Sequence, residues 1–360
     1  MDHKKICFLL DSFATGGTGR VTSIIGNKLC DIGYDVYALE YSDSSGKRIY
    51  DTRFPVQHAY PNVISLRKAI LRNHYLSLVK NYLKSNKIDI VFSCGVQFYP
   101  VATFLSKICG IKSICWDHTS PLRTGDFRFQ SSSRHIGALT SNCNVVLTKQ
   151  ALDIYNKRYP FKKNVHIYNP IDPQLIRNDR YNISSKKIIS VGRLSLGKRF
   201  DCLIRIAASI LKRHNDWIWD IYGDGPEREN LEKLVQQYGL SGHLNLKGQV
   251  NDLYRRYGEY SFMVMTSKWE GFPMTLLEGA ANLLPLVAFD VPTGPREIIH
   301  NGINGYICQD NAEAEMGRRI EELIENPEKR FSMSDGNKEI IRQFDIDAIT
   351  TKWKQLLSGL

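Results

Sequence analysis

The strongest constraint on the fold is an alternation of short apolar runs with helical segments, which begins near Lys5 and begins again at Ile188. Strands that alternate with helices predict parallel sheets with both faces covered. At 360 residues the chain suggests two domains of about 150 to 180 residues each. The predicted fold class is therefore α/β, with two Rossmann-like, doubly wound domains.

The element boundaries follow from the same pattern. In the first half we expect strands at 5–11, 35–41, 89–93, 113–116 and 144–148, and helices at 18–30, 101–109 and 149–159. In the second half we expect strands at 188–191, 217–222, 243–247, 262–266, 286–289 and 305–308, and helices at 201–213, 226–238, 275–284, 312–325, 328–344 and 346–357. A polar segment at 169–187 is interpreted as the linker. This gives an N-terminal domain at 1–175 and a C-terminal domain at 176–345, with a helix at about 346–360 that can pack back on the first.

The net charge of +11 is distributed unevenly. Residues 1–175 carry 23 Lys and Arg against 12 Asp and Glu, whereas residues 176–360 carry 25 of each. A basic amphipathic helix is predicted at 66–87, which could lie on an anionic membrane, pack on a core, or be a solvated face. The stretch lacks a nucleic-acid motif or an aromatic stacking pattern, so no nucleic-acid partner is expected.

Cysteine spacing and hydropathy indicate the compartment. The eight cysteines include no C-x-x-C pair, and Cys115 with His118 has no second pair to complete a zinc site. The apolar run Ile6–Leu10 is too short for a signal peptide, and no stretch approaches the roughly 18 apolar residues of a membrane span. We expect reduced thiols in a cytoplasmic protein.

A pair of carboxylates in the second half indicates a ligand site. Glu270 lies in the loop after the strand that ends near Ser267, and Glu278 lies about one turn into the following helix. This loop is at the carboxyl end of a strand, where open α/β sheets bind ligands. Two acids that meet one ligand there would grip hydroxyls, which predicts a sugar-nucleotide site.

Two further loops carry groups that suit a diphosphate. Arg193 and Lys198 follow the strand 188–191 and precede a helix, and solvated loop charges are the alternative interpretation. Gly16 and Gly17 follow the first strand, where glycines permit close approach of the backbone to a ligand. A plain turn is the alternative for that loop, because it matches neither G-x-G-x-x-G nor the phosphate-binding loop.

His118 follows the strand that ends at Trp116, so it too lies at the carboxyl end of a strand. It could hydrogen-bond a sugar hydroxyl at the reaction centre, although a structural histidine is the commoner case. The acids of Asp345-Ile346-Asp347 resemble the metal motif of another transferase class but precede a helix, where acids cap N-termini. No metal site and no cofactor are expected.

Taken in order, these motifs resemble the retaining family 4 glycosyltransferases, whose fold is GT-B, two facing Rossmann-like domains. The resemblance covers nearly the whole chain and is strongest in the second half. It rests on these segments: Val191-Gly192-Arg193-Leu194 with Lys198, Tyr222-Gly223-Asp224-Gly225-Pro226, Leu246-Lys247-Gly248, Glu270-Gly271-Phe272-Pro273 with Glu278, Gly294-Pro295-Arg296-Glu297 and Asn301-Gly302-Ile303-Asn304-Gly305.

The resemblance implies a role for each matched residue. Glu270 would hold hydroxyls of the transferred sugar, Glu278 the ribose hydroxyls, and Arg193 with Lys198 the diphosphate. His118 looks like the family's active-site histidine. The donor would also be lined by backbone or side chains of Gly16, Gly17, Val250, Gly271, Phe272, Pro273, Met274, Thr275 and Leu276. The family's first loop has Gly-Gly-Ala-Glu-Arg, but this chain has Gly19 where the acid stands, which puts a side-chain role there in doubt.

The function expected is a cytoplasmic, metal-independent, retaining hexosyltransferase that uses a nucleotide diphosphate sugar, with UDP as the expected nucleotide. Its acceptor would be lipid-linked or saccharide, as in cell-surface polysaccharide assembly, and the enzyme could be peripheral at the inner face of the membrane. The alternatives are a sugar-nucleotide hydrolase or epimerase, or a non-catalytic protein that binds polysaccharide or nucleic acid.

Overall fold

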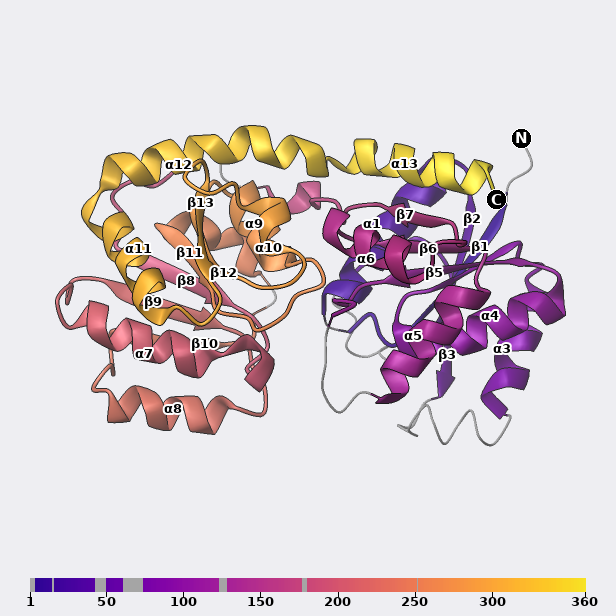
Figure 1. Ribbon diagram of the computed structural model, residues 1–360, viewed down its shortest axis with the longest axis horizontal. Helices are drawn as coiled ribbons and strands as arrows, with labels where there is room; N and C mark the ends of the chain where they lie inside the picture. The colour runs from indigo at the N-terminus through magenta and orange to yellow at the C-terminus, as the bar shows by residue number, and fades with distance from the viewer. Residues whose placement is uncertain are drawn as a thin grey trace. The chain divides into compact units, whose positions relative to one another are not determined.

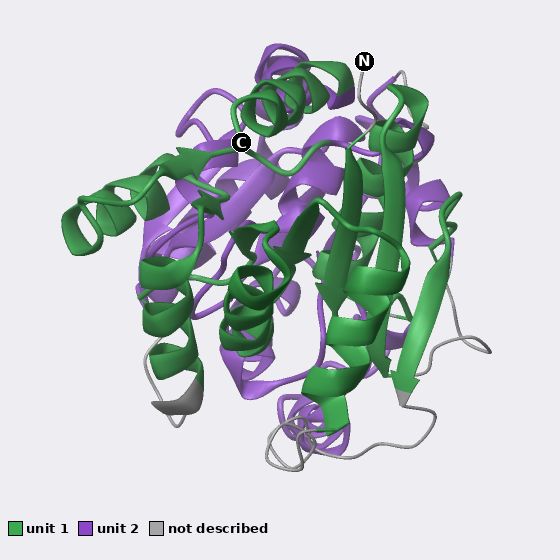
Figure 2. Ribbon diagram, turned by 90° about the vertical axis from the view of Figure 1, so that its right-hand side faces the viewer, with its two compact units in different colours: residues 1–170, 347–360 green, residues 171–346 purple. Residues whose placement is uncertain are grey.

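The structure is a computed structural model of the chain, and it describes residues 4–14, 16–42, 50–60, 74–122, 128–176, 180–250 and 252–360. The chain divides into two compact units (Figure 2). Unit 1 comprises residues 1–170 together with 347–360, and unit 2 comprises residues 171–346. The second unit thus begins a few residues before the boundary expected from the sequence, and the C-terminal helix belongs to the first.

Unit 1 contains a seven-stranded parallel sheet in the order β3-β2-β1-β4-β5-β6-β7 (Figure 1). Its strands are β1 (Lys5–Leu10), β2 (Asp35–Ser42), β3 (Val56–Tyr60), β4 (Ile90–Ser93), β5 (Lys112–Asp117), β6 (Cys143–Val146) and β7 (Asn164–His166). Its helices are α1 (Gly17–Asp31), α3 (His74–Ser85), α4 (Tyr99–Cys109), α5 (Arg128–Thr140), α6 (Lys149–Arg158) and α13 (Ile346–Ser358). The doubly wound parallel sheet expected for this half is confirmed.

Unit 2 contains a six-stranded parallel sheet in the order β10-β9-β8-β11-β12-β13. Its strands are β8 (Lys187–Val191), β9 (Ile218–Tyr222), β10 (Leu244–Gly248), β11 (Phe262–Met265), β12 (Leu286–Asp290) and β13 (Gly305–Gln309). Its helices are α7 (Phe200–Leu211), α8 (Arg228–Gln237), α9 (Met274–Ala281), α10 (Pro295–Ile298), α11 (Glu313–Glu325) and α12 (Pro327–Ile340). All six predicted strands of this half are present, each within about two residues of its expected ends.

The core of each unit explains why these segments fold as they do. In unit 2 the sheet residues Ile188, Trp219 and Val264 are buried against the apolar faces of α7 and α11. In unit 1, α13 buries Trp353, whose ring centroid lies 4.9 Å from that of Trp116 and 5.5 Å from that of Phe92. An amphipathic C-terminal helix is therefore fixed to the sheet of unit 1 by an aromatic cluster.

Three elements of unit 1 are missing from the sequence prediction, namely β3, α5 and β7. The basic helix expected at 66–87 lies partly outside the described residues, and its described part is α3.

The segment interpreted as a linker is attached to unit 2 beyond residue 180. There the hydroxyl of Tyr181 donates to the carbonyl of Ser261 at 2.7 Å, and that of Ser185 donates to the carbonyl of Glu259 at 2.6 Å.

The strand orders fix where each unit would hold a ligand. The chain reverses its winding direction between β1 and β4 in unit 1, and between β8 and β11 in unit 2. In open α/β sheets, ligands bind beyond the carboxyl ends of the strands at such a reversal. The loops that follow β8 and β11 carry Lys198 and Glu270, so the sheet of unit 2 places the two predicted donor loops side by side.

Candidate functional site

The predicted donor loops of unit 2 meet in an ion pair. Nζ of Lys198 lies 2.5 Å from Oε1 of Glu270, with 27% of the lysine side chain and 11% of the glutamate side chain exposed. The two loops also touch through their backbones, because N–H of Lys268 donates to the carbonyl of Gly197 at 2.9 Å. A partly exposed pair of opposite charge can open toward a ligand that offers both a phosphate and a hydroxyl.

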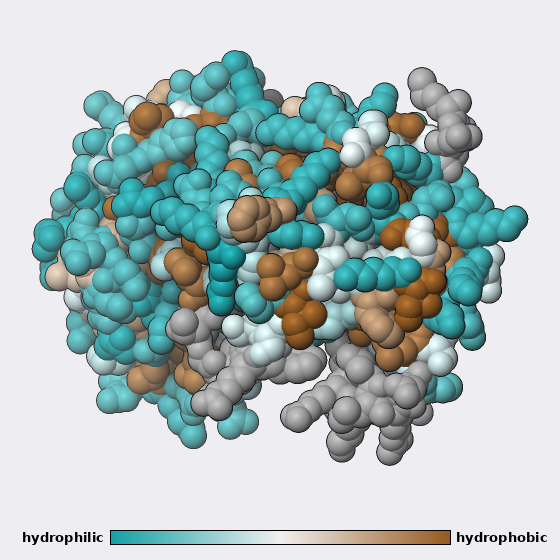
Figure 3. All heavy atoms as spheres, turned by 45° about the vertical axis from the view of Figure 1, so that its right-hand side comes forward, coloured by the Kyte–Doolittle hydropathy of each residue, from teal (hydrophilic) through white to brown (hydrophobic). Residues whose placement is uncertain are grey.

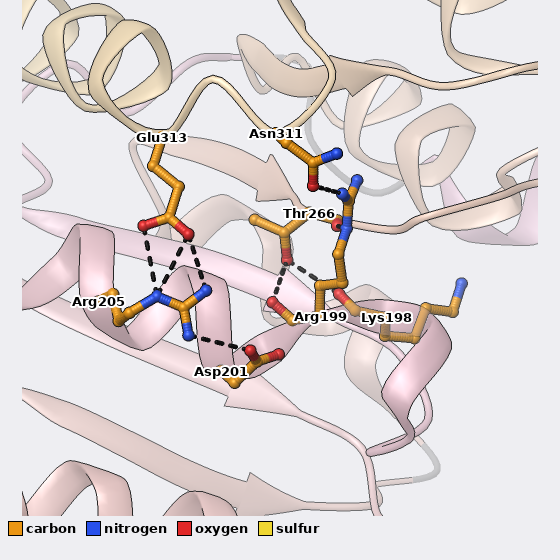
Figure 4. Close-up of polar contacts among 7 residues, drawn as sticks. All are labelled: Lys198, Arg199, Asp201, Arg205, Thr266, Asn311 and Glu313. Atoms are coloured by element: carbon orange, nitrogen blue, oxygen red, sulfur yellow. Dashed lines mark hydrogen bonds and ion pairs between the residues drawn. The ribbon is translucent and has the colours of Figure 1, made fainter.

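Arg199 fixes the backbone beside Lys198, although the sequence analysis gave it no role. Its guanidinium donates to the carbonyls of Thr266 and Ser267, each at 2.8 Å, and to Oδ1 of Asp310 at 2.6 Å and the side chain of Asn311. In return Oγ1 of Thr266 donates to the carbonyl of Lys198 at 2.9 Å. Figure 4 shows the side chain of Lys198 extending away from these contacts, which leaves its ammonium available to the site.

Arg199 holds a backbone conformation that few side chains adopt. Its φ of 50° and ψ of 44° lie in the left-handed region, directly before helix α7. Such a conformation costs an ordinary residue about 1 kcal/mol or more, and it persists when surrounding contacts determine it. Here the guanidinium contacts to residues just after β11 and β13 hold the backbone of Arg199 in this conformation. The network in Figure 4 also includes Arg205, whose ion pairs with Asp201 and Glu313 are more exposed.

Arg193 lies on the same loop as Lys198, but its side chain is not in an ion pair with a described residue. Its side chain is exposed, and among the described residues its guanidinium has no hydrogen-bond or ion-pair partner. The loop that carries it packs closely against the glycine turn that follows β9. A Cβ on Gly223 would lie 1.9 Å from the carbonyl oxygen of Gly192, and one on Gly225 would lie 2.3 Å from that of Leu194. The structure therefore brings Lys198 and Glu270 into contact and leaves Arg193 as a cation beside them.

The Glu270 loop is held by the segment after β12. The side chain of Thr293 donates to the carbonyl of Glu270, and Gly294 has φ of 100° where a Cβ would lie 2.5 Å from Cδ of Pro273. The predicted donor-lining segment follows, with Gly271, Met274 and Thr275 half-buried and with Phe272, Pro273 and Leu276 buried. The Phe272 ring is buried and packs on Phe344 with 5.6 Å between centroids.

Glu278 is a buried carboxylate. It lies in α9 and is 8% exposed, and its Oε2 accepts a hydrogen bond from the hydroxyl of Tyr257 at 2.7 Å. Val250, predicted to touch the base, is half-buried just beyond the end of β10. The four predicted groups Lys198, Glu270, Glu278 and Val250 thus come from segments that follow β8, β11 and β10.

In unit 1, the glycine loop after β1 leads directly into α1. Gly16 has φ of 93° and precedes Gly17, the first residue of the helix. A Cβ on Gly19 would lie 2.5 Å from the carbonyl oxygen of Ser12 and 3.2 Å from Cα of Phe13. This contact explains why the chain has glycine where the resembling family has an acid, since the helix lies against the loop.

A buried carboxylate that the sequence analysis did not single out positions that loop. Oε1 of Glu40, at the end of β2, accepts a hydrogen bond from the backbone N–H of Phe13 at 2.6 Å. Its other oxygen lies 3.1 Å from Nδ1 of His58 in β3. Glu40 is 0% exposed, and a single acid in the apolar run of a predicted strand was the signal that could have revealed it.

His118 lies at the end of β5 on a loop fixed by an ion pair. The Asp117 carboxylate accepts from Nε of Arg134 at 2.8 Å, from the hydroxyl of Tyr155 at 2.7 Å and from the backbone of Thr119 at 3.0 Å. Burial lowers the pKa of His118 from 6.5 to about 4, although the Asp117 charge opposes that shift. Its Nε2 is buried without a partner among the described residues, and its ring packs at a tilt against that of Trp116, with 4.3 Å between centroids. The imidazole is therefore neutral at physiological pH.

The thiols, the acidic side chains and the helix lengths complete the description. The eight cysteines are all free thiols. Within the described ranges no cluster of three or more His, Cys, Asp or Glu side chains could hold a metal ion, and Asp347 pairs with Lys28 at 2.7 Å. Of the helices described, none is long and apolar enough to span a bilayer.

Comparison with known proteins adds relatives that match most of the chain. The family model described as glycosyl transferases group 1 matches residues 175–340. Over 357 residues the chain is 28% identical to an uncharacterised glycosyltransferase of Haemophilus influenzae, covering 97% of this chain and 98% of that one. It is also 28% identical over 372 residues to the amylovoran biosynthesis glycosyltransferase AmsD of Erwinia amylovora, covering 98% and 99%.

Solved structures share the same fold. A mutant of TarM from S. aureus, crystallised with UDP, superposes with a TM-score of 0.85 at 16% identity and covers 98% of this chain and 99% of its own. HepE of Anabaena, crystallised with UDP and glucose, gives 0.85 at 18% identity and covers 99% and 100%. Both likenesses extend over the two units and confirm the expected two-domain architecture.

Proposed function

The chain is a glycosyltransferase of the GT-B fold whose residues 175–340 match the glycosyl transferases group 1 family, and from this premise we propose what it transfers and how. The donor is a UDP-hexose, and the acceptor is a lipid-linked or saccharide molecule of cell-surface polysaccharide biosynthesis. The observation that carries the proposal is the Lys198–Glu270 pair, which lies beyond the carboxyl ends of β8 and β11. AmsD, named for amylovoran biosynthesis, and HepE, solved with UDP and glucose, support the acceptor and donor classes.

Each donor group binds a different part of the nucleotide sugar. Lys198 and Arg193 neutralise the diphosphate, and Glu270 accepts hydrogen bonds from hydroxyls of the sugar. Glu278, held by Tyr257, accepts hydrogen bonds from the ribose. The donor replaces the contact between Lys198 and Glu270 with one phosphate for the cation and one hydroxyl for the anion. Because a single ligand then satisfies both charges, neither is left buried without a partner.

The transfer proceeds with retention of configuration at the anomeric carbon. The bond from that carbon to the phosphate oxygen breaks while the bond to the acceptor oxygen forms on the same face, and the acceptor proton passes to the leaving phosphate. Negative charge grows on the diphosphate during this step, and fixed cations that already point at it stabilise the transition state. Arg193 and Lys198 supply that stabilisation, and we propose that no metal ion is needed.

The acceptor side lies in unit 1, where His118 is neutral at physiological pH and can exchange hydrogen bonds with a hydroxyl without adding charge. The proposed location is the cytoplasm, with peripheral attachment to the inner face of the membrane. The excess of basic residues in the first half supports a lipid-linked or anionic acceptor.

The donor is tested by thermal unfolding with UDP, GDP and ADP sugars, followed by transfer assays on lipid-linked and free saccharide acceptors. The proposal expects a rise in melting temperature with one UDP-sugar and product only when acceptor is present. Release of free UDP without acceptor at the full rate would indicate a hydrolase instead. Stabilisation by a polysaccharide but by no nucleotide sugar would indicate a binding protein.

A further inference from the structure

Unit 1 buries an ion pair directly beside His118. Arg134 of α5 is 5% exposed, and Asp117, the last residue of β5, is 2% exposed. Nε of Arg134 donates to Oδ2 of Asp117 at 2.8 Å. Charged side chains usually lie at the surface, and Figure 3 shows hydrophilic residues over most of the face that it presents. Because a buried pair is often no more stabilising than apolar residues of similar volume, packing alone does not explain this one.

The pair fastens the loop that carries His118. Nη2 of Arg134 donates to Oγ1 of Thr119 at 2.6 Å and to the carbonyl of Ser120 at 3.4 Å. Oδ1 of Asp117 accepts from the backbone N–H of Thr119 at 3.0 Å and from its hydroxyl at 2.8 Å. The residues on both sides of His118 are therefore held, so the backbone position of this histidine depends on the guanidinium of Arg134.

Arg134 also balances the negative charge next to the imidazole. A carboxylate close to a histidine favours its cationic form. Burial lowers the pKa of His118 to about 4, and the charge of Asp117 acts in the opposite direction. Although burial acts to lower the pKa of Arg134, the charge of Asp117 raises it above its ordinary value, so the guanidinium remains positive. Because the two charges of the pair oppose each other, the imidazole stays neutral.

Titratable side chains on the neighbouring elements are neutral at physiological pH. Burial raises the pKa of each of them, namely Tyr99 of α4, Cys115 of β5, and Tyr155 and Tyr159 at α6. The hydroxyl of Tyr155 also donates to Oδ2 of Asp117 at 2.7 Å. A further cation, Lys162 in the turn after α6, acts on the thiol of β5, and α13 packs against β5 through uncharged tryptophan rings. Loss of Arg134 would therefore leave Asp117 as the main charge acting on His118.

We propose that Arg134 is a positioning residue for the acceptor side of the transfer, which holds the loop after β5 and pairs Asp117 so that His118 offers a neutral imidazole to an acceptor hydroxyl. Nε2 of His118 is buried without a partner among the described residues. A buried polar atom in this state costs free energy, and an acceptor hydroxyl would supply the missing hydrogen bond. The inference rests on the proposed function, because it assumes that His118 meets the acceptor.

The charge of His118 is tested by NMR titration of the full chain labelled with 13C-histidine. The His118 signal is identified by its absence from His118→Asn and is followed from about pH 8 to about pH 5. In the wild type we expect no titration in this range. In Arg134→Gln the unpaired Asp117 should raise the midpoint by about one pH unit or more, into the measured range. Arg134→Gln combined with Asp117→Asn removes both charges and should return the midpoint to its wild-type position.

Transfer kinetics test the consequence for the acceptor, with the UDP-sugar and acceptor that give product with the wild type. Arg134→Lys keeps the charge but loses the planar fork to Thr119 and Ser120. We therefore expect kcat/KM for the acceptor to fall about tenfold, while the Kd for UDP stays within about twofold and the His118 titration matches the wild type. In Arg134→Gln, activity should be lost at a higher pH than in the wild type, by the shift that NMR measures.

Arg330 supplies a matched control in unit 2. It is 4% exposed in α12, and its guanidinium donates to three backbone carbonyls. Arg330→Gln also removes a buried arginine, but it should leave the His118 midpoint and the acceptor kinetics unchanged. An unchanged midpoint in Arg134→Gln, or equal effects of the two Gln variants, would overturn the proposal. Wild-type kinetics in Arg134→Lys would do so too, and this variant carries the test if Arg134→Gln does not fold. The titration needs neither donor nor acceptor, so its failure is distinct from failure of the proposed function.

Discussion

Nζ of Lys198 and Oε1 of Glu270 lie 2.5 Å apart although 72 positions separate them in the chain. They meet because β8 and β11 are neighbours in the sheet and their following loops leave the same edge. The pair joins the cation proposed for the diphosphate to the anion proposed for the sugar. Its geometry means that a change to either residue alters the environment of the other.

Replacing Lys198 should lower turnover far more than it lowers stability. For Lys198→Met we expect kcat to fall about 100-fold or more, because a fixed positive charge on a developing anion contributes about 3 kcal/mol. Lys186 forms an equally short pair with Asp216, but both side chains are more than half exposed, so Lys186→Met should change neither rate nor stability by more than about 1 kcal/mol. Initial-rate kinetics with a UDP-sugar measures the difference. Unchanged kcat in Lys198→Met would refute the site assignment.

Variants of Glu270 and Glu278 should differ in which part of the donor they affect. Glu278→Gln is expected to weaken UDP binding about tenfold, since a buried charged hydrogen bond to the ribose is worth about 1.5 kcal/mol. Glu270→Gln is expected to leave UDP binding within about twofold and to lower transfer of the sugar, because UDP lacks the hydroxyls that Glu270 holds. Calorimetric titration with UDP and with the UDP-sugar measures both. Equal effects of the two variants on UDP would contradict the division of roles, and Tyr257→Phe reports the part due to positioning Glu278.

Arg199 should act through Lys198 rather than on the substrate. Arg199→Lys keeps the charge but loses the fork to Thr266, Ser267 and Asp310, so we expect about 1 to 3 kcal/mol lower stability and a lower kcat with KM little changed. Arg199→Gly removes the backbone cost of the left-handed conformation but also the clamp, and should not recover the rate. Arg205→Lys is the control, because its pairs are more exposed. Steady-state kinetics and chemical denaturation of all three variants measure these effects. A fully active Arg199→Lys variant would argue against a role of Arg199 in positioning Lys198.

The contrast between Lys198 and Arg199 shows what sequence reasoning can reach. Lys198 follows a predicted strand at the position expected of a phosphate ligand, so position in the chain alone indicates it. The role of Arg199 depends on Asp310 and Asn311, more than 110 positions away, and on a backbone angle that no local pattern reveals. Glu40 was missed for the same reason, since its partner Phe13 belongs to another strand end.

Helix α5 was missed because its sequence opposes a helix. It contains three consecutive serines and Gly137, which have low helix propensity. Tertiary contacts determine it instead. Arg134 pairs with Asp117, and a Cβ on Gly137 would lie 2.3 Å from Cβ of Tyr99, so the helix requires glycine where it crosses α4. The second half was predicted better because each strand there ends in a glycine or charged motif.

Restoring the family's acid at Gly19 should harm the protein. Gly19→Glu would place a Cβ 2.5 Å from the Ser12 carbonyl oxygen, so we expect about 1 to 3 kcal/mol lower stability and no gain in activity. The matched control is Gly317→Ala in α11, where nothing lies within 4 Å of the added Cβ and helix propensity predicts about 1 kcal/mol higher stability. Denaturation of both variants gives the comparison. A Gly19→Glu variant with wild-type stability would show that α1 can move from the loop.

His118 should make unit 1 sensitive to acid. Its pKa is lowered to about 4 in the folded state, so between pH 6.5 and 4 the unfolded chain binds a proton that the folded chain does not. Stability from this group is therefore complete above pH 6.5 and is lost as pH falls toward 4, by about 3 kcal/mol in all. His118→Asn removes the titration and should flatten the stability profile over that window, while His300→Asn, at an exposed position, should leave it unchanged. Denaturant unfolding at a series of pH values measures the three profiles, and parallel curves for wild type and His118→Asn would mean that the imidazole reaches solvent in the folded state.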